Sequence, residues 1–322
     1  MLEAGQVVPL GAGAYRLRKQ LAGSSYGVVW QAAGPSHDVA LKLVNRPQMA
    51  RALPAHRERW IASAKTEIDF LRSLRPWDER HIVRLLDSGE HDGLPVMALE
   101  LMDTDLGRHL ASERAAGRRA GLGAILGWME QINQALAKVH QYGWKYLDLK
   151  PGNVLLGAAR GTVKLADFGT SRARAGLPCA AYAGTANWQS PEQFFLSPSN
   201  TYDTDARSDY FALGAMFYYL VTDGLPLRFC RDCGQAWRDH QSRAAERLLA
   251  ANGGKRPLTL HDDEARLFVQ RIRQRATGSR HSGATASLAL LRSLLAPERA
   301  DRPGHAMQIA RMIAAIRERA AP

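Results

Sequence analysis

Residues 146–169 read YLDLKPGNVLLGAARGTVKLADFG, and this stretch decides the fold of the chain. Its apolar runs, residues 154–156 and 163–166, flank the turn-prone segment GAARG. Short apolar runs joined by such a turn favour an antiparallel β-hairpin. We therefore predict a hairpin at the centre of the sequence.

Polar side chains flank this predicted hairpin. Asn153 precedes its first strand and Asp167 follows its second, so we expect pairing to bring the two side by side. Asp148 and Lys150 add an acid and a cation in the loop just upstream. Mg²⁺ bound to a polyphosphate takes one or two protein oxygens together with phosphate oxygens. The pattern therefore predicts a magnesium–polyphosphate site.

The order D-L-K-P-x-N followed by D-F-G resembles the catalytic and metal-binding loops of the eukaryotic-like serine/threonine protein kinases. The resemblance implies an α+β, bilobal protein kinase fold with a small, mostly β lobe over residues 1–102 and a larger helical lobe over residues 103–322. It also implies ATP and Mg²⁺ as cofactors. By the same resemblance Asp148 orients the substrate hydroxyl, Lys150 neutralises the transferred phosphoryl group, and Asn153 and Asp167 hold the metal.

The first part of the sequence is expected to hold three strands, over residues 15–21, 27–32 and 39–44. The first turn resembles the glycine-rich loop of the family, with Gly23, Gly27 and the following Val29. Ala22 and Ser24 stand where the family has its first two glycines, which predicts weaker nucleotide binding.

The segment VALK resembles the kinase strand whose lysine, here Lys42, holds the α- and β-phosphates. Glu67 lies in a predicted helix and is the expected ionic partner of Lys42. An additional helix is expected around residues 57–64. Similarity to the family assigns the adenine edge to the backbone of Glu100 and Met102, and both faces of the ring to three apolar residues, Val29, Ala40 and Leu155.

Sequence beyond the DFG motif adds three family markers. GTANWQSPE resembles the end of an activation segment, with Glu192 expected to be buried against Arg302, and Asp209 is expected to anchor the catalytic loop. Leu147 stands where many of these kinases have an arginine that binds a phosphorylated residue of this segment. We therefore predict basal activity without such phosphorylation, with control by a regulatory protein partner.

Composition restricts the class of protein. The chain has 322 residues, 46% of them hydrophobic, and a formal charge of +12. Its basic residues are scattered without interleaved aromatics, so no nucleic-acid binding is expected. The longest apolar run, residues 210–221, is too short to cross a bilayer, and the start of the sequence lacks a secretory signal pattern. Three cysteines suit a reducing compartment, so a cytoplasmic location is expected.

The segment FCRDCG leaves alternatives open. Cys230 and Cys233 have zinc-knuckle spacing, and His240 and His261 follow them, but a second CxxC is missing. The two cysteines are therefore a structural zinc site, a pair of ordinary thiols or a reversible disulfide.

The sequence as a whole predicts transfer of the γ-phosphoryl group of Mg-ATP to Ser or Thr hydroxyls of protein substrates. The lysine two residues after Asp148 favours Ser/Thr over Tyr, by similarity to the family. Two alternatives remain: a pseudokinase scaffold, which the altered glycine loop and Leu147 suggest, and a small-molecule phosphotransferase.

Overall fold

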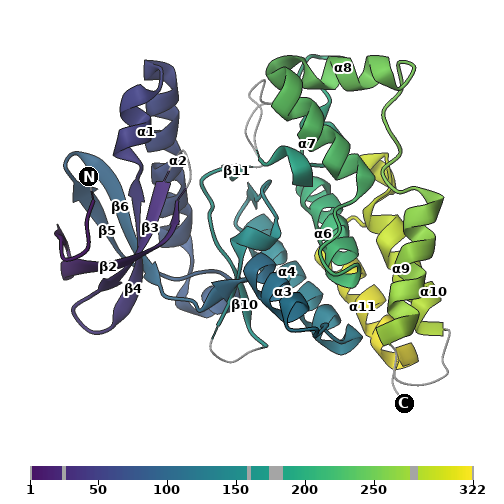
Figure 1. The fold of residues 1–322 in the computed structure, drawn as a ribbon, viewed down its shortest axis with the longest axis horizontal. Coiled ribbons are helices and arrows are strands. Elements are labelled where there is room, and N and C mark those ends of the chain that lie inside the picture. The colour runs from purple at the N-terminus through teal and green to yellow at the C-terminus, as the bar shows by residue number, and fades with distance from the viewer. Residues whose placement is uncertain (1, 24–26, 158–160, 174–183, 276–281, 321–322) are drawn as a thin grey trace. The chain divides into compact units, whose positions relative to one another are not determined.

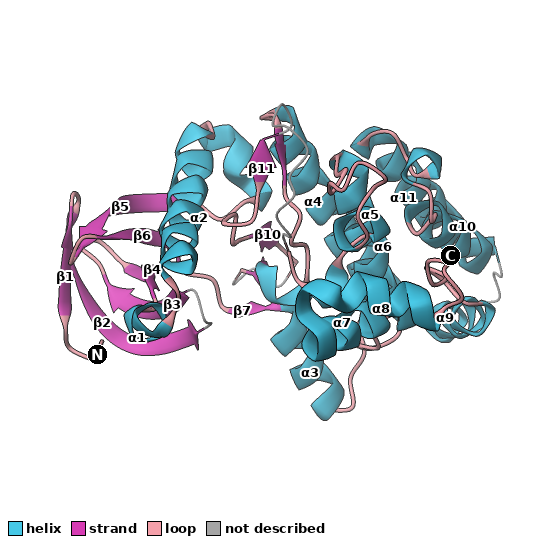
Figure 2. Ribbon diagram, turned by 90° about the horizontal axis from the view of Figure 1, so that it is seen from above, coloured by secondary structure: helices cyan, strands magenta, loops and turns pink. Residues whose placement is uncertain are grey.

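The chain forms two units in the computed structural model (Figure 1). All residues are described except residues 1, 24–26, 158–160, 174–183, 276–281 and 321–322. The first unit consists of Met1–Asp103 together with Ala166–Ser171, and the second of Thr104–Leu165 together with Arg172–Pro322. Strands dominate the first unit and helices the second (Figure 2).

A six-stranded antiparallel sheet forms most of the first unit, in the order β1-β2-β3-β4-β6-β5. Its strands are β1 (Val7–Leu10), β2 (Gly13–Gly23), β3 (Gly27–Ala33), β4 (Asp38–Val44), β5 (Leu85–His91) and β6 (Leu94–Glu100). The three strands predicted at the start are confirmed. β1 was not predicted, because its four residues include a proline and show no alternation.

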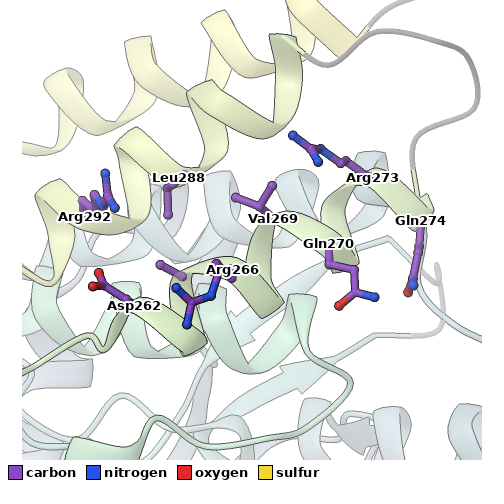
Figure 3. Close-up of a pocket in the computed structure, with 9 residues that line it drawn as sticks. Asp262, Arg266, Val269, Gln270, Arg273, Gln274, Leu288 and Arg292 are labelled. Atoms are coloured by element: carbon purple, nitrogen blue, oxygen red, sulfur yellow. The ribbon is translucent and has the colours of Figure 1, made fainter.

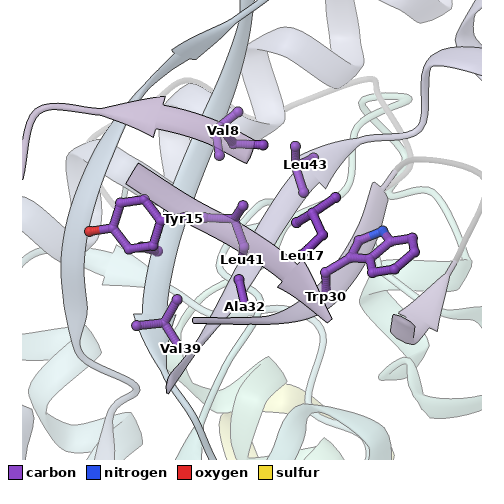
Figure 4. Packing of buried hydrophobic residues seen from close by; sticks show 10 residues of the cluster. Val8, Tyr15, Leu17, Trp30, Ala32, Val39, Leu41 and Leu43 are labelled. Carbon is purple, nitrogen blue, oxygen red and sulfur yellow. The ribbon is translucent and has the colours of Figure 1, made fainter. Parts of the chain in front are cut away.

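The sheet curls until its two edge strands lie near each other. Asp87 of β5 accepts hydrogen bonds from the Ala12 amide (2.8 Å) and the Tyr15 hydroxyl (3.0 Å). Ala12 lies between β1 and β2, and Tyr15 lies near the start of β2. Gly13 makes the sharp connection possible, because its φ is +145° and an added Cβ would lie 2.6 Å from Pro35. The enclosed face buries one apolar cluster, part of which Figure 4 shows.

Side-chain alternation separates this core from the opposite face of the sheet. Leu41 and Leu43 of β4 belong to the buried cluster, so Ala40 and Lys42 project from the other face. Val29 of β3 pairs directly with Lys42 and therefore shares that face. The alternation of β4 thus accounts for both its core residues and its candidate functional residues.

Helices α1 (Arg46–Arg51) and α2 (Pro54–Ser73) and the short helix η1 (Pro76–His81) complete the first unit. The prediction of a separate helix over residues 57–64 is wrong. No glycine or proline interrupts the chain after Pro54, so one helix of 20 residues continues to Ser73. It buries Ile68, Phe70 and Leu71.

The predicted central hairpin is confirmed in the second unit. Strands β9 (Val154–Leu156) and β10 (Val163–Leu165) pair antiparallel, and β7 (Thr104–Asp105) extends them on the β9 side. The first pair is Leu156 with Val163 and the last is Val154 with Leu165. The expected alignment of Asn153 with Asp167 is wrong by one residue, because Asn153 lies three residues before Leu156 while Asp167 lies four residues after Val163.

Helices form the rest of the second unit, around the almost wholly buried α6 (Ala206–Val221). The apolar spacing of Ile132, Leu136 and Val139 predicts an amphipathic helix over residues 128–142, and α4 (Leu122–Gln141) confirms it, starting six residues earlier. A two-stranded sheet pairs β8 (Trp144–Lys145) with β11 (Arg172–Ala173). The other helices are α3 (Leu106–Ala115), α5 (Pro191–Phe194), α7 (Arg228–His240), α8 (Ala244–Ala251), α9 (Asp262–Arg275), α10 (Ser282–Leu294) and α11 (Ala306–Ala320), with short turns η2 (Pro151–Asn153), η3 (Ala186–Trp188), η4 (Gln241–Arg243) and η5 (Arg299–Asp301).

Among the described residues, no helix has both the length and the apolar character needed to cross a membrane.

Candidate active site

Lys42 is held between two carboxylates in the first unit. Its Nζ lies 2.6 Å from Glu67 Oε2 and 2.8 Å from Asp167 Oδ1. The expected ion pair with Glu67 is therefore present. Burial acts to lower the pKa of Lys42, but the charges of Asp167 and Glu67 outweigh it and raise the pKa above its usual value. Lys42 is therefore a fixed cation at neutral pH.

The DFG segment is anchored to α2. The Phe168 ring stacks on Phe70 with centroids 4.5 Å apart, and the Ser63 hydroxyl donates to the Gly169 carbonyl at 2.8 Å. A Cβ on Gly169 would lie 2.3 Å from the Ser63 hydroxyl oxygen, so a larger residue there would displace the Ser63 side chain and its hydrogen bond. These contacts hold Asp167 in its left-handed conformation beside Lys42.

A second cluster surrounds Asp148 in the second unit. Lys150 Nζ lies 2.7 Å from Asp148 Oδ2 and 2.8 Å from Thr185 Oγ1, while Thr185 donates to Asp148 Oδ1 at 2.7 Å. The Asn153 amide nitrogen donates to the Asp148 carbonyl and to Oδ2, both at 3.0 Å. Because the nitrogen of Asn153 makes these bonds, its amide oxygen is the atom suited to a hard cation.

Asp209 fixes the backbone that carries Asp148. Its carboxylate accepts from the amides of Tyr146 (2.9 Å) and Leu147 (2.7 Å), and His140 Nε2 lies 2.8 Å from it. Asp209 is 1% exposed, so these bonds act with little competition from water. The anchoring role expected of Asp209 is present in the structure.

Leu147 has φ +65°, a conformation that costs energy for a leucine. Its carbonyl accepts from Gln193 Nε2 at 3.0 Å, and a Cβ on Gly184 would lie 2.5 Å from the same oxygen. The Leu147 side chain is buried and offers no cation. Gln193, at the end of the predicted activation segment, thus holds this loop.

The remaining sequence-predicted residues lie on several elements. Gly23 and Gly27 end β2 and begin β3, and the turn between them, including Ser24, lies outside the described residues. Glu100 ends β6, and Met102 follows it. Leu155 lies in β9 of the second unit. The nucleotide-binding roles of these residues stay predictions.

Cys230 and Cys233 are buried on one face of α7 as free thiols. Burial raises the pKa of both, which disfavours the thiolate that binds zinc. The described part of the chain holds no group of three or more potential metal-ligating His, Cys, Asp or Glu side chains. The structure favours ordinary thiols.

Sequence reasoning missed three residues of these clusters. It treated Thr185 as structural and did not single out Gln193 or Ser63. A polar residue three positions after Ser190, typical of a capping box, was the available signal for Gln193. Thr185 and Ser63 gave no local signal, because their partners are 37 and 106 positions away.

Comparison with known proteins agrees with this arrangement. Residues 15–312 match the profile of the protein kinase domain. The chain is 29% identical over 70% of its length to serine/threonine-protein kinase PknL of Mycobacterium bovis (strain ATCC BAA-935 / AF2122/97), covering 54% of that protein. It is 27% identical over 66% of its length to the probable serine/threonine-protein kinase pknA2 of Bifidobacterium longum (strain NCC 2705), covering 27% of that protein.

The chain thus spans between about a quarter and about half the length of these two relatives. The profile match covers most of the chain and includes the Lys42, Asp148 and Asp167 clusters. The chain therefore belongs to the protein kinase domain family.

Proposed function

We propose that this chain is the catalytic part of a serine/threonine protein kinase with a bilobal fold, which transfers the γ-phosphoryl group of ATP to protein hydroxyls. The single observation that carries the proposal is the bonded cluster of Asp148, Lys150, Asn153 and Thr185. Burying a carboxylate costs stability even when three side chains bond to it, so stability alone does not explain this cluster. A carboxylate fixed in this way suits proton transfer at a defined position.

In this proposal Asp148 accepts the proton of the attacking hydroxyl. Lys150 lies beside it and stabilises the negative charge of the transferring phosphoryl group. Thr185 bonds both residues and keeps them in register. Catalysis then depends on orientation and charge stabilisation, because phosphoryl transfer requires little covalent chemistry from the protein.

We assign Lys42 to the ATP phosphates and Glu67 to holding Lys42. The Asp167 carboxylate, which is half-exposed, and the Asn153 amide oxygen are hard oxygen donors that fit Mg²⁺. Bound Mg²⁺ would neutralise phosphate charge. The loop with Gly23 and Gly27 is assigned to covering the ATP phosphates. The adenine edge is assigned to the backbone of Glu100 and Met102, and the faces of the ring to Val29, Ala40 and Leu155.

Protein hydroxyls are the proposed acceptors because both relatives are named serine/threonine-protein kinases. The buried pair of Glu192 with Arg302 and the anchoring Asp209 also belong to the protein kinase pattern rather than to small-molecule phosphotransferases. Leu147 cannot bind a phosphate, so we propose control by a regulatory protein partner.

A pseudokinase remains the second candidate, because Ala22 and Ser24 replace two glycines of the phosphate loop. Purified protein incubated with γ-labelled ATP, Mg²⁺ and generic protein substrates tests both. We expect label on Ser and Thr, and Asp148→Asn as the matched control should lose it while keeping the wild-type melting temperature. Nucleotide binding without transfer would support the pseudokinase, and label on small alcohols or amines alone would support a small-molecule enzyme.

A further inference from the structure

A groove of about 720 Å³ lies between α9 and α10 of the second unit (Figure 3). α9 contributes Arg266, Val269 and Arg273, which recur at helical spacing and therefore lie on one face. α10 contributes Leu288 and Arg292, one turn apart. None of these residues belongs to the clusters around Lys42 or Asp148.

The rim of the groove is cationic. Arg266, Arg273 and Arg292 are exposed and line it, against one carboxylate, that of Asp262. Within the described ranges, none of the three guanidinium groups forms an ion pair. Arg228 of α7, by contrast, pairs with Asp263 of α9. The groove therefore presents uncompensated positive charge.

The floor of the groove is apolar. Val269 and Leu288 are half-buried and project into the space between the two helices in Figure 3. Ala265 also lines the groove and is buried. An apolar floor inside a charged rim is typical of surfaces that bind another protein. Among the described residues, no aromatic side chain lines the groove, so this part of the chain offers no stacking platform of the kind that single-stranded nucleic acid uses.

We propose that this groove, the α9–α10 groove, binds an acidic segment of a partner protein, with an apolar side chain between two carboxylate groups. Arg266 and Arg273 are seven residues apart, which is about 10 Å along a helix axis. In a peptide with polyproline II geometry, which has three residues per turn and rises about 3.1 Å per residue, residues three apart face the same side and are separated by a similar distance of about 9 Å. The fitting sequence therefore has acidic residues three positions apart with a leucine-like residue between them.

Arginine suits this partner, because its planar guanidinium binds carboxylates through two parallel hydrogen bonds. Exposed pairs of this kind are individually weak and weaken further with salt. The apolar contact adds the part of the binding that salt does not remove. Binding in the micromolar range, with partial salt dependence, is the expected result for a short peptide.

Fluorescence anisotropy of a labelled EELEELEE peptide tests the proposal without any phosphoryl transfer, so its result is independent of the kinase activity. Arg266→Glu and Arg273→Glu should each weaken binding at least tenfold. Arg247→Glu, the same charge change at an exposed position of α8, should change it less than twofold. Leu288→Ser should weaken binding and leave its salt dependence unchanged.

Melting temperatures of the variants establish that each is folded, and Arg273→Lys is the milder variant if charge reversal unfolds α9. Equal weakening by Arg247→Glu would mean that net charge alone attracts the peptide and would overturn the proposal. Tighter binding of a single-stranded RNA of similar charge, lost in Arg273→Glu, would overturn it in favour of nucleic acid. No binding by the wild type up to millimolar peptide would also overturn it.

Discussion

Replacing Arg302 by methionine should destabilise the second unit by about 3–5 kcal/mol, the usual cost of leaving one partner of a buried ion pair alone. The Arg302 side chain is fully buried, and its two terminal nitrogens lie 2.7 and 3.0 Å from the two oxygens of Glu192. It also donates to the carbonyls of Ala296, Pro297 and Arg207. Methionine replaces none of these donors.

The magnitude follows from what would remain. Glu192 would keep the hydroxyl of Ser208 at 2.7 Å and lose its cation, while three backbone carbonyls would lose a donor. Arg302 also packs over the Phe211 ring, 4.9 Å from its centroid. An exposed pair such as Arg243 with Glu246 should contribute less than about 1 kcal/mol, so it is the matched control.

The pair should also make stability depend on pH. Burial acts to raise the pKa of Glu192, but the hydrogen bonds and charge of Arg302 lower it below its usual value. A lowered pKa means that this stabilisation is present above the unfolded-state pKa and is lost as pH falls through the lower folded-state pKa. Glu192→Gln should therefore lose less stability on acidification than the wild type.

Urea unfolding of wild type, Arg302→Met, Glu192→Gln and the double variant, each at pH 7 and at pH 4, measures the stability cost of each change and how that cost depends on pH. The double variant should cost less than the sum of the single variants, because neither charge is then left alone. Additive costs below about 1 kcal/mol each, equal to those of Arg243→Ala, would refute the buried pair.

Further predictions concern the candidate site and the cysteines. Asp167→Asn should lower Mg²⁺-dependent turnover by roughly a thousandfold, or about 4 kcal/mol in the barrier, with an unchanged melting temperature; wild-type turnover would remove Asp167 from the metal site. Gln193→Ala should lower kcat by about tenfold without changing KM for ATP, since Gln193 positions Leu147 and contacts no nucleotide group in our proposal; an effect on KM alone would contradict this role. Cys230 and Cys233 should resist a thiol reagent until urea unfolds the protein, because both are buried with raised pKa values. Rapid labelling of the native protein at these positions, measured by mass spectrometry, would show that α7 opens.

Local patterns predicted much of the fold, because they depend on neighbours in the sequence. The run of residues 39–44 predicted strand β4, which carries Lys42. The turn segment after Leu156 predicted the hairpin, and the helical period predicted α4. The family motifs, which have fixed spacing, singled out Asp148 and the other residues of its cluster.

Features that depend on contacts between distant parts of the chain could not be predicted from local sequence patterns. Whether α2 breaks near residue 64 depends on its packing against the sheet, and no stop signal in the sequence separates the two possibilities. The hairpin register differs by one residue from the expectation, because it depends on how many residues the turn takes up before Leu156 and Val163 pair. The CxxC spacing suggested a metal, while the helix α7 buries both thiols.

The sequence by itself determined the order of the elements, the face of each amphipathic strand and helix, and the identity of the motif residues, since each follows from periodicity or spacing within a short window. Only the tertiary structure decided that Thr185 joins Asp148 to Lys150, that Gln193 holds Leu147, and that three arginines share a groove. These are contacts between residues far apart in the chain or on different helices. They depend on how side chains pack in three dimensions, and a one-dimensional pattern carries no direct record of that packing.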